Sequence, residues 1–124
     1  MEATLVQGVA ECCGDLDPDE SRIRAWQAEM VAPESARALA SVFKALCDPT
    51  RLRLISLLVR QEFCVGDLAA ALKVGQSVVS HQLRDMRQMG WVRDRREGRH
   101  VFYTLDDEHV RDLYLQALAH IGQG

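Results

Sequence analysis

The chain has 124 residues, of which 48% are hydrophobic and 27% charged, and its formal net charge is −3 at pH 7. This length suits one domain with one core, and such a core is small enough that a partner subunit can be needed to complete it. No apolar run approaches the roughly 20 residues of a membrane span, and the N-terminus lacks the basic start of a signal peptide. We therefore expect a soluble, cytoplasmic protein with no membrane partner.

The charge is divided unevenly along the chain. Residues 1–34 carry a net charge of −6, residues 35–105 carry +6, and residues 106–124 carry −3. Affinity for phosphates depends on the local basic surface rather than on the total charge. The middle segment is therefore the part expected to face nucleic acid.

Residues 1–20 are acidic and show no sustained periodicity, which predicts a flexible arm in front of a domain covering residues 21–124. The arm contains the adjacent pair Cys12 and Cys13, whose spacing is unfavourable for a disulfide between them. They are either metal ligands or idle surface thiols. Four cysteines in an intracellular protein favour metal or redox chemistry over structural disulfides.

Three helices are expected next. Ser21–Val31 has apolar residues on one side, and Pro33 suits the first turn of a helix running to about Leu46. Asp48 and Pro49 are typical of a cap and a first helical position, so the following helix should span Pro49–Arg60. Cys47 is expected in the core, and the residues predicted to be buried in the second of these helices are Ala36, Leu39, Ala40, Phe43 and Leu46.

The segment from Phe63 to Trp91 has the pattern of a helix-turn-helix. Apolar residues recur at helical spacing in Val65–Leu72 and again from Gln76 onward, with Ser77 expected to cap the second helix and Gly90 to end it. In this motif the second helix enters the DNA major groove. An ordinary helical hairpin is the alternative. The candidate base-reading residues are Gln76, Ser77, Ser80, His81 and Arg84.

Residues 91–105 predict a β-hairpin with glycine at its turn. A helix-turn-helix followed by such a hairpin is a winged helix-turn-helix, so the fold class is mainly α with a small β-hairpin. A run of solvated surface charges is the alternative explanation for the basic residues near the tip, which would otherwise contact phosphates or the minor groove. These residues are Arg93, Arg95, Arg96, Arg99 and His100.

The last predicted helix, Asp107–Ile121 with Asp106 as its cap, is strongly amphipathic. Its apolar face is available to a second subunit, which favours a homodimer. His109 and His120 lie beside this face but about 16 Å apart along the axis, too far for one helix to bring both to one ion. Two antiparallel copies of the helix would form two equivalent sites. The alternative is a pair of surface histidines; the candidate ligands are Asp107, His109, His120 and Gln123.

Four motifs in order, ALCDPTRLRLI, EFCVGDLA, SVVSHQLRDMR and GRHVFYTL, resemble the metal-responsive winged-helix repressors of the ArsR–SmtB family. The resemblance implies a homodimer that represses its operator when metal-free and releases the DNA when metal binds. It also implies Zn(II) coordination by the paired last helices, through residues matching Asp107, His109 and His120. The fourth family position holds His or Glu, whereas Gln123 is a neutral amide and a poor zinc ligand.

The resemblance further implies a second, thiol-based type of metal site. Cys64 matches the family cysteine before the recognition helix, Asp67 is a possible oxygen ligand, and Cys12 or Cys13 of the other subunit would join them. A second cysteine two residues after the first is replaced by Gly66 here, which excludes a four-thiolate cage through that motif. Soft ligands favour Cd(II), Pb(II), As(III) or Zn(II).

Two other classes of function remain for comparison. A thiol redox or persulfide-responsive repressor of the same fold would use Cys64 with Cys47 or the arm cysteines, and it needs a reactive, exposed thiol of low pKa. An enzyme would need a nucleophile or an open metal position with a general base. The sequence contains no His-Glu-x-x-His motif, phosphate-binding glycine loop or nucleophile elbow. We therefore predict no catalytic residues and no small organic substrate.

Overall fold

The computed structural model of the protein describes residues 19–122. The chain divides into two units, the first ending at Ala40 and the second beginning at Ser41, and each is described by itself. Within residues 19–122 no helix has the length and apolar character needed to cross a membrane.

The first unit contains helix α2, Glu20–Glu29, and the beginning of helix α3, Pro33–Leu46. Asp19 caps α2 because its carboxylate accepts hydrogen bonds from the backbone N–H groups of Ser21 and Arg22. The guanidinium of Arg22 lies over the ring of Trp26, 5.4 Å from its centroid. No residue of α2 is buried in the chain, so its apolar side chains contribute nothing to the core.

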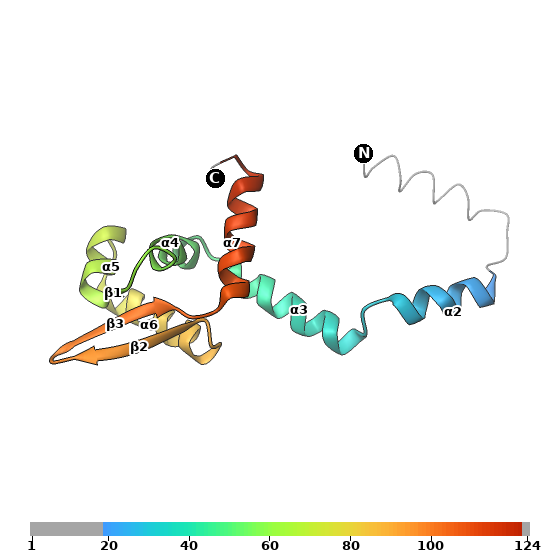
Figure 1. The fold of residues 1–124 in the computed structure, drawn as a ribbon, viewed down its shortest axis with the longest axis horizontal. Coiled ribbons are helices and arrows are strands. Elements are labelled where there is room, and N and C mark those ends of the chain that lie inside the picture. The colour runs from blue at the N-terminus through green and yellow to red at the C-terminus, as the bar shows by residue number, and fades with distance from the viewer. Residues whose placement is uncertain (1–18, 123–124) are drawn as a thin grey trace. The chain divides into compact units, whose positions relative to one another are not determined.

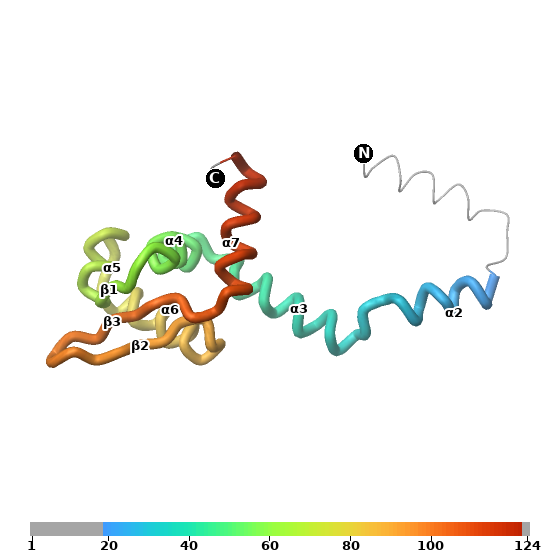
Figure 2. Tube along the Cα trace, viewed as in Figure 1, coloured from blue at the N-terminus to red at the C-terminus, as the bar shows by residue number. Residues whose placement is uncertain are grey.

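The second unit holds the winged helix, and Figures 1 and 2 show the path of the chain through it. After the end of α3 the elements are α4 Pro49–Leu58, β1 Phe63–Cys64, α5 Val65–Leu72, α6 Gln76–Gln88, β2 Val92–Glu97, β3 His100–Leu105 and α7 Glu108–His120. The predicted helix-turn-helix and hairpin are confirmed, as is Asp48 as the cap of α4, since its side chain accepts from Thr50 N–H.

The core of this unit is made by one side of each of α4, α5 and α6, together with the start of the wing and one residue of α7. Burial of such side chains is worth about 1.5–3 kcal/mol each. Among the described residues no polar or charged side chain is buried. The fully or nearly fully buried residues are Leu54, Ile55, Leu58, Leu68, Ala69, Leu72, Val79, Leu83, Met86, Trp91, Val92 and Val110.

The wing belongs to an antiparallel three-stranded sheet in the order β1-β3-β2. Strands β2 and β3 pair from Val92 opposite Leu105 to Glu97 opposite His100. Gly98, with φ of +64°, supplies the left-handed conformation that the tight turn requires. Strand β1 pairs Cys64 with Phe102. This third strand was not predicted, because two residues are too short to produce an alternating pattern.

Two predicted helix starts are wrong by one or two residues. Helix α6 begins at Gln76 after Gly75, whose backbone is extended, so Ser77 lies inside the helix and makes no capping hydrogen bond. Helix α7 is capped by Asp107 rather than Asp106, because the Asp107 carboxylate accepts from the N–H groups of His109 and Val110. Gly90, with φ of +77°, follows the end of α6 as predicted.

The predicted burial of α3 is wrong for the single chain. No residue of α3 is buried, and Leu39 and Phe43 are 52% and 53% exposed. Cys47, predicted to be in the core, is also exposed. The apolar spacing correctly predicted an amphipathic helix, but periodicity does not distinguish a face covered by the same chain from one left for a partner.

Candidate nucleic-acid interface and metal sites

Helix α6 has one apolar and one polar side. Val79, Leu83 and Met86 are completely buried in the shared core, where α6 packs against α5 and β2. The opposite side exposes most of the residues predicted to read bases: Gln76, Ser77, His81 and Arg84 are exposed and Ser80 is buried in part. Most of the candidate base-reading side chains of α6 are therefore exposed to the solvent.

The turn in front of α6 is tight and glycine-containing. Lys73 ends α5 in the left-handed conformation, with φ of +58°, and its backbone N–H donates to carbonyl groups of the last turn of α5. Gly75 precedes α6 directly. This arrangement gives two short helices and a short turn, which are the elements of a helix-turn-helix.

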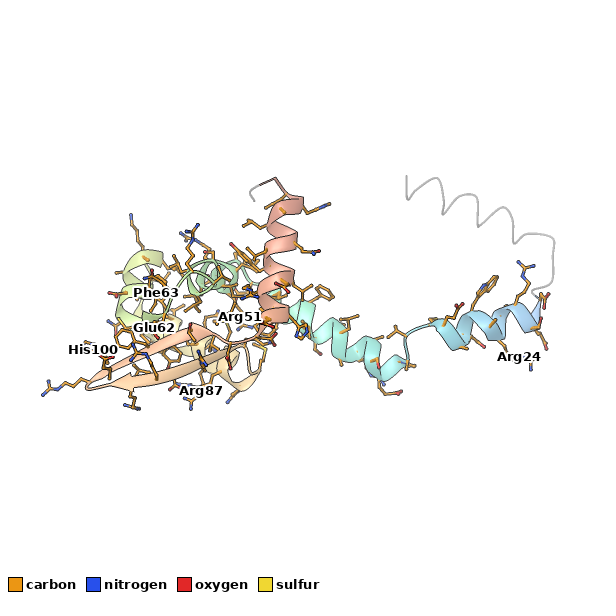
Figure 3. All side chains as sticks on the ribbon, viewed as in Figure 1. Arg24, Arg51, Glu62, Phe63, Arg87 and His100 are labelled. Atoms are coloured by element: carbon orange, nitrogen blue, oxygen red, sulfur yellow. The ribbon has the colours of Figure 1, made fainter. Side chains whose placement is uncertain are left out.

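The arginines of the wing fall into two groups. Arg95 donates three hydrogen bonds to the Glu62 carboxylate and one, of 2.7 Å, to Glu97. Its guanidinium also lies 4.8 Å from the centroid of the Phe102 ring. Arg96 and Arg99 are exposed and form no ion pair with another described residue. Figure 3 shows Glu62 beside the wing and His100 toward its tip.

The Arg95 and Glu62 pair changes the proton affinity of both groups. The hydrogen bond from Arg95 lowers the pKa of the Glu62 carboxyl, and the hydrogen bond to Glu62, with a second to Glu97, raises the pKa of Arg95 further. Both groups therefore remain charged near neutral pH. Glu62 was not singled out in the sequence, because its partner lies 33 residues away.

The predicted ligands of the last helix occupy its two ends. Asp107 and His109 lie at the start of α7, with Asp107 Oδ1 3.6 Å from His109 Nδ1, and His120 is its last residue. The His109 side chain is 96% exposed. Both capping hydrogen bonds of Asp107 end on Oδ1. Gln123 lies outside the described residues.

The predicted thiol ligands are only partly described. Cys64 is half-buried at the N-cap position of α5, and Asp67 is exposed in the first turn of that helix. Cys12 and Cys13 lie outside the described residues. Within residues 19–122 no three His, Cys, Asp or Glu side chains are placed to hold a metal ion together.

An apolar groove lies between the end of α3, helix α4 and helix α7. We call five large apolar residues that line it, from the end of α3 and from α7 with its C-cap, the α3–α7 face: Phe43, Leu46, Leu113, Leu118 and Ile121. Phe43 and Ile121 are 53% and 68% exposed, so a large part of this face is open to solvent in the single chain. Cys47 and His120 also line the groove.

The helix-turn-helix, the exposed polar side of α6 and the basic hairpin beside it define a winged-helix DNA-binding protein. Residues 48–94 match the model of the bacterial regulatory proteins of the arsR family. The chain belongs to this family and is a transcriptional regulator rather than an enzyme.

The similarity to individual relatives extends beyond the matched segment. A transcriptional repressor SmtB homolog of Synechocystis sp. is 50% identical over 81% of this chain and 76% of its own length. The cadmium resistance transcriptional regulatory protein CadC homolog of Staphylococcus aureus is 38% identical over 73% of this chain and 75% of its own. The crystal structure of the AntR antimony-specific transcriptional repressor superposes with a TM-score of 0.68 at 29% identity and covers 89% of each chain.

Proposed function

We propose that the protein is a metal-sensing repressor that binds double-stranded operator DNA as a homodimer when metal-free and dissociates when Zn(II) or a soft metal binds. The observation that carries this proposal is the division of potential ligands between the two ends of α7, with Asp107 and His109 at its start and His120 at its end. The names of two relatives support a metal signal, because one is a cadmium resistance regulator and another is an antimony-specific repressor. Repression of an operator would take place in the cytoplasm.

Homodimer formation is supported by the exposed α3–α7 face. Apolar side chains that a small domain leaves in contact with water typically mark an interaction surface. A second copy placed with its α7 antiparallel to the first would cover this face and bring His120 of each chain toward Asp107 and His109 of the other. Two equivalent sites per dimer follow from the symmetry.

DNA binding is supported by the exposed side of α6 and by the wing. Gln76, Ser77, Ser80, His81 and Arg84 would face base edges in the major groove, while Arg96 and Arg99 would reach phosphates. Arg95 was predicted to join them, but its contacts with Glu62 and Glu97 favour a role in holding the wing. In a dimer the two recognition helices would meet half-sites about 34–36 Å apart.

The donor set at the ends of α7 fits Zn(II), since two imidazoles and a carboxylate are typical zinc ligands. Because Asp107 uses Oδ1 for capping, its Oδ2 is available to a metal without loss of the helix cap. Cys64 with Asp67 and the arm cysteines would instead suit Cd(II), Pb(II) or As(III). A metal bound across the subunits would fix the angle between them, and the two recognition helices would no longer match the half-sites.

The test is operator release by zinc in a His109→Ala and His120→Ala double variant. The operator is a duplex selected by the metal-free protein from a random-sequence pool, and binding is followed by fluorescence anisotropy. The variant should bind this duplex with wild-type affinity but keep it when zinc is added. Full release by zinc would show that the α7 site is not the sensor.

A Co(II) titration of the reduced protein then distinguishes the two kinds of site. Strong sulfur-to-cobalt charge-transfer bands would place the metal on Cys64 and the arm cysteines. Tetrahedral d–d bands without them would place it on Asp107, His109 and His120. Absence of Co(II) uptake would contradict both sites and would favour the thiol redox or persulfide-responsive alternative.

A further inference from the structure

A chain of hydrogen-bonded polar side chains joins α6 to the junction between α3 and α4. Arg51 Nε donates to Gln82 Oε1 over 2.7 Å, and Gln82 Nε2 donates to Asp48 Oδ2 over 2.8 Å. Arg51 Nη2 also lies 3.4 Å from Asp85 Oδ2. We call this set of four residues, Asp48, Arg51, Gln82 and Asp85, the junction clamp.

The clamp is attached firmly at the junction. Arg51 Nη1 donates to the backbone carbonyl of Ala45 in the last turn of α3, over 3.1 Å, and the Arg51 side chain is only 11% exposed. The second carboxylate oxygen of Asp48 caps α4 through Thr50 N–H. The hydrogen bond from Gln82 lowers the pKa of the Asp48 carboxyl, which keeps this acceptor charged at neutral pH.

On α6 the clamp lies directly beside residues that would read DNA. Gln82 is flanked in sequence by His81, whose Nε2 lies 3.6 Å from Asp85 Oδ2, and is followed two positions later by Arg84. The buried contacts of α6 are apolar and non-directional. Hydrogen bonds depend strongly on angle and distance. The clamp therefore adds a directional restraint on the orientation of α6 to the non-directional one from its apolar contacts.

We propose that the junction clamp positions the recognition helix for its operator, with Gln82 and Arg51 acting as positioning residues that need not touch DNA themselves. This proposal rests on the proposed DNA-binding function of α6. Because the clamp ends on the carbonyl of Ala45, it ties the orientation of α6 to the end of α3, the same segment that contributes Phe43 and Leu46 to the α3–α7 face. A change in the packing of that face would reach α6 through these hydrogen bonds.

The test reverses the direction of one hydrogen bond. In Gln82→Glu, the new carboxylate still accepts a hydrogen bond from Arg51. It has no N–H group to donate to the Asp48 carboxylate, so the two carboxylates face each other without a hydrogen bond. In the double variant Asp48→Asn and Gln82→Glu, the amide introduced at position 48 can donate to the carboxylate introduced at position 82. The amide oxygen still caps α4, since asparagine is as good a cap as aspartate. The double variant therefore restores the clamp at unchanged net charge.

Affinity is measured by fluorescence anisotropy for two duplexes, one selected by the wild-type protein from a random pool and one of scrambled sequence. Gln82→Glu should lower the preference for the selected duplex about tenfold, as expected when charged partners lose their hydrogen bond. The double variant should recover a preference for the selected duplex within about threefold of that of the wild type, because the effects of substitutions at contacting residues are not additive.

Gln88→Glu is the matched control, since it adds the same charge to the exposed last residue of α6, which forms no hydrogen bond with the four clamp residues. A general charge effect would weaken both duplexes equally in the two single variants. Gln82→Met removes both hydrogen bonds without adding charge, and it replaces Gln82→Glu if thermal unfolding shows that the latter does not fold. It should show the same loss of preference.

An equal duplex preference in Gln82→Glu and Gln88→Glu, or an additive loss in the double variant, would refute the clamp. Failure of the wild-type protein to select any duplex would instead overturn the proposed DNA-binding function on which the clamp depends. Selection by the wild type, loss in Gln82→Glu and recovery in the double variant would establish Gln82 as a positioning residue.

Discussion

The helix-turn-helix core and the α3–α7 face differ in how their apolar residues are covered. In the core, Leu83 and Met86 are completely buried, and α6 packs there against α5 and the start of the wing. On the α3–α7 face, residues of similar size and spacing remain open to solvent. The comparison shows that helical periodicity identifies an apolar face equally well in both regions. Only the structure shows which face the chain can cover by itself.

The first way to test this difference is to truncate one leucine of the core and one exposed leucine of α7 that lies outside the α3–α7 face. Leu83→Ala should destabilise the fold by about 2–5 kcal/mol, because it leaves a cavity among buried side chains. Leu115→Ala, at a position 44% exposed on α7, should change the free energy of unfolding by no more than about 0.5 kcal/mol. Urea denaturation at one fixed protein concentration measures both values, and similar losses in the two variants would contradict the assignment of the core.

A charge on the α3–α7 face should prevent association without unfolding the chain. Leu113→Glu should weaken the proposed homodimer at least about thirtyfold, the effect expected of a residue central to an interface. Leu115→Glu is the matched control, because Leu115 lies on the same helix with similar exposure but does not line the groove. Sedimentation equilibrium gives both dissociation constants. Equal effects in the two variants would mean that the groove is not the subunit contact.

The wing offers a smaller comparison, between Arg95 with its carboxylate partners and the two arginines that form no ion pair within residues 19–122. Arg96→Ala, or Arg99→Ala, should weaken DNA binding and reduce the slope of log affinity against log salt by about 1. Arg95→Ala should leave the slope close to that of the wild type, because Glu62 and Glu97 already neutralise this guanidinium. Anisotropy titrations at several salt concentrations measure the slopes, and a reduced slope for Arg95→Ala would return this residue to the DNA contacts.

The smallest expected effect is an acid-dependent loss of the contact between the wing and the segment before β1. The pKa of Glu62 is lowered in the folded chain by Arg95. Its stabilising contribution is therefore complete above the unfolded value, about 4.3, and is lost as the pH falls through the lower folded value. Wild type and Glu62→Gln should differ in urea midpoint at pH 6 and converge as the pH falls below about 4. A difference that persists at low pH would show that ionisation of Glu62 is not its cause.

The helices and the turn of the wing could be predicted from the sequence because each depends on residues that are close together in the chain. Apolar spacing indicated α5 and α6, Asp48 and Pro49 marked the start of α4, and Gly98 marked the turn of the wing. The one-residue error at α7 arose because Asp106 and Asp107 are equally good caps by residue type. Only the extended backbone at Asp107 decides between them.

The long-range parts were not accessible in the same way. The hydrogen bonds of Gln82 with Asp48 and of Arg95 with Glu62 join residues more than 30 positions apart, and no local pattern marks them. The candidate metal ligands were selected from helical spacing and family resemblance. Their assembly into one site requires a second chain. The structure describes each end of α7, and the approach of the ligands from two chains remains a prediction.

The order of the sheet also affects how copies of this protein can assemble. Strand β2 lies at an edge, and five successive charged residues, 93–97, run along it. A charged edge discourages the backbone pairing by which exposed strands aggregate. At the other edge, β1 offers only two residues. Pairing of two copies through the sheet is thus disfavoured at both edges, so contacts between copies are left to the helices. The same edges protect the wing from strand-to-strand aggregation.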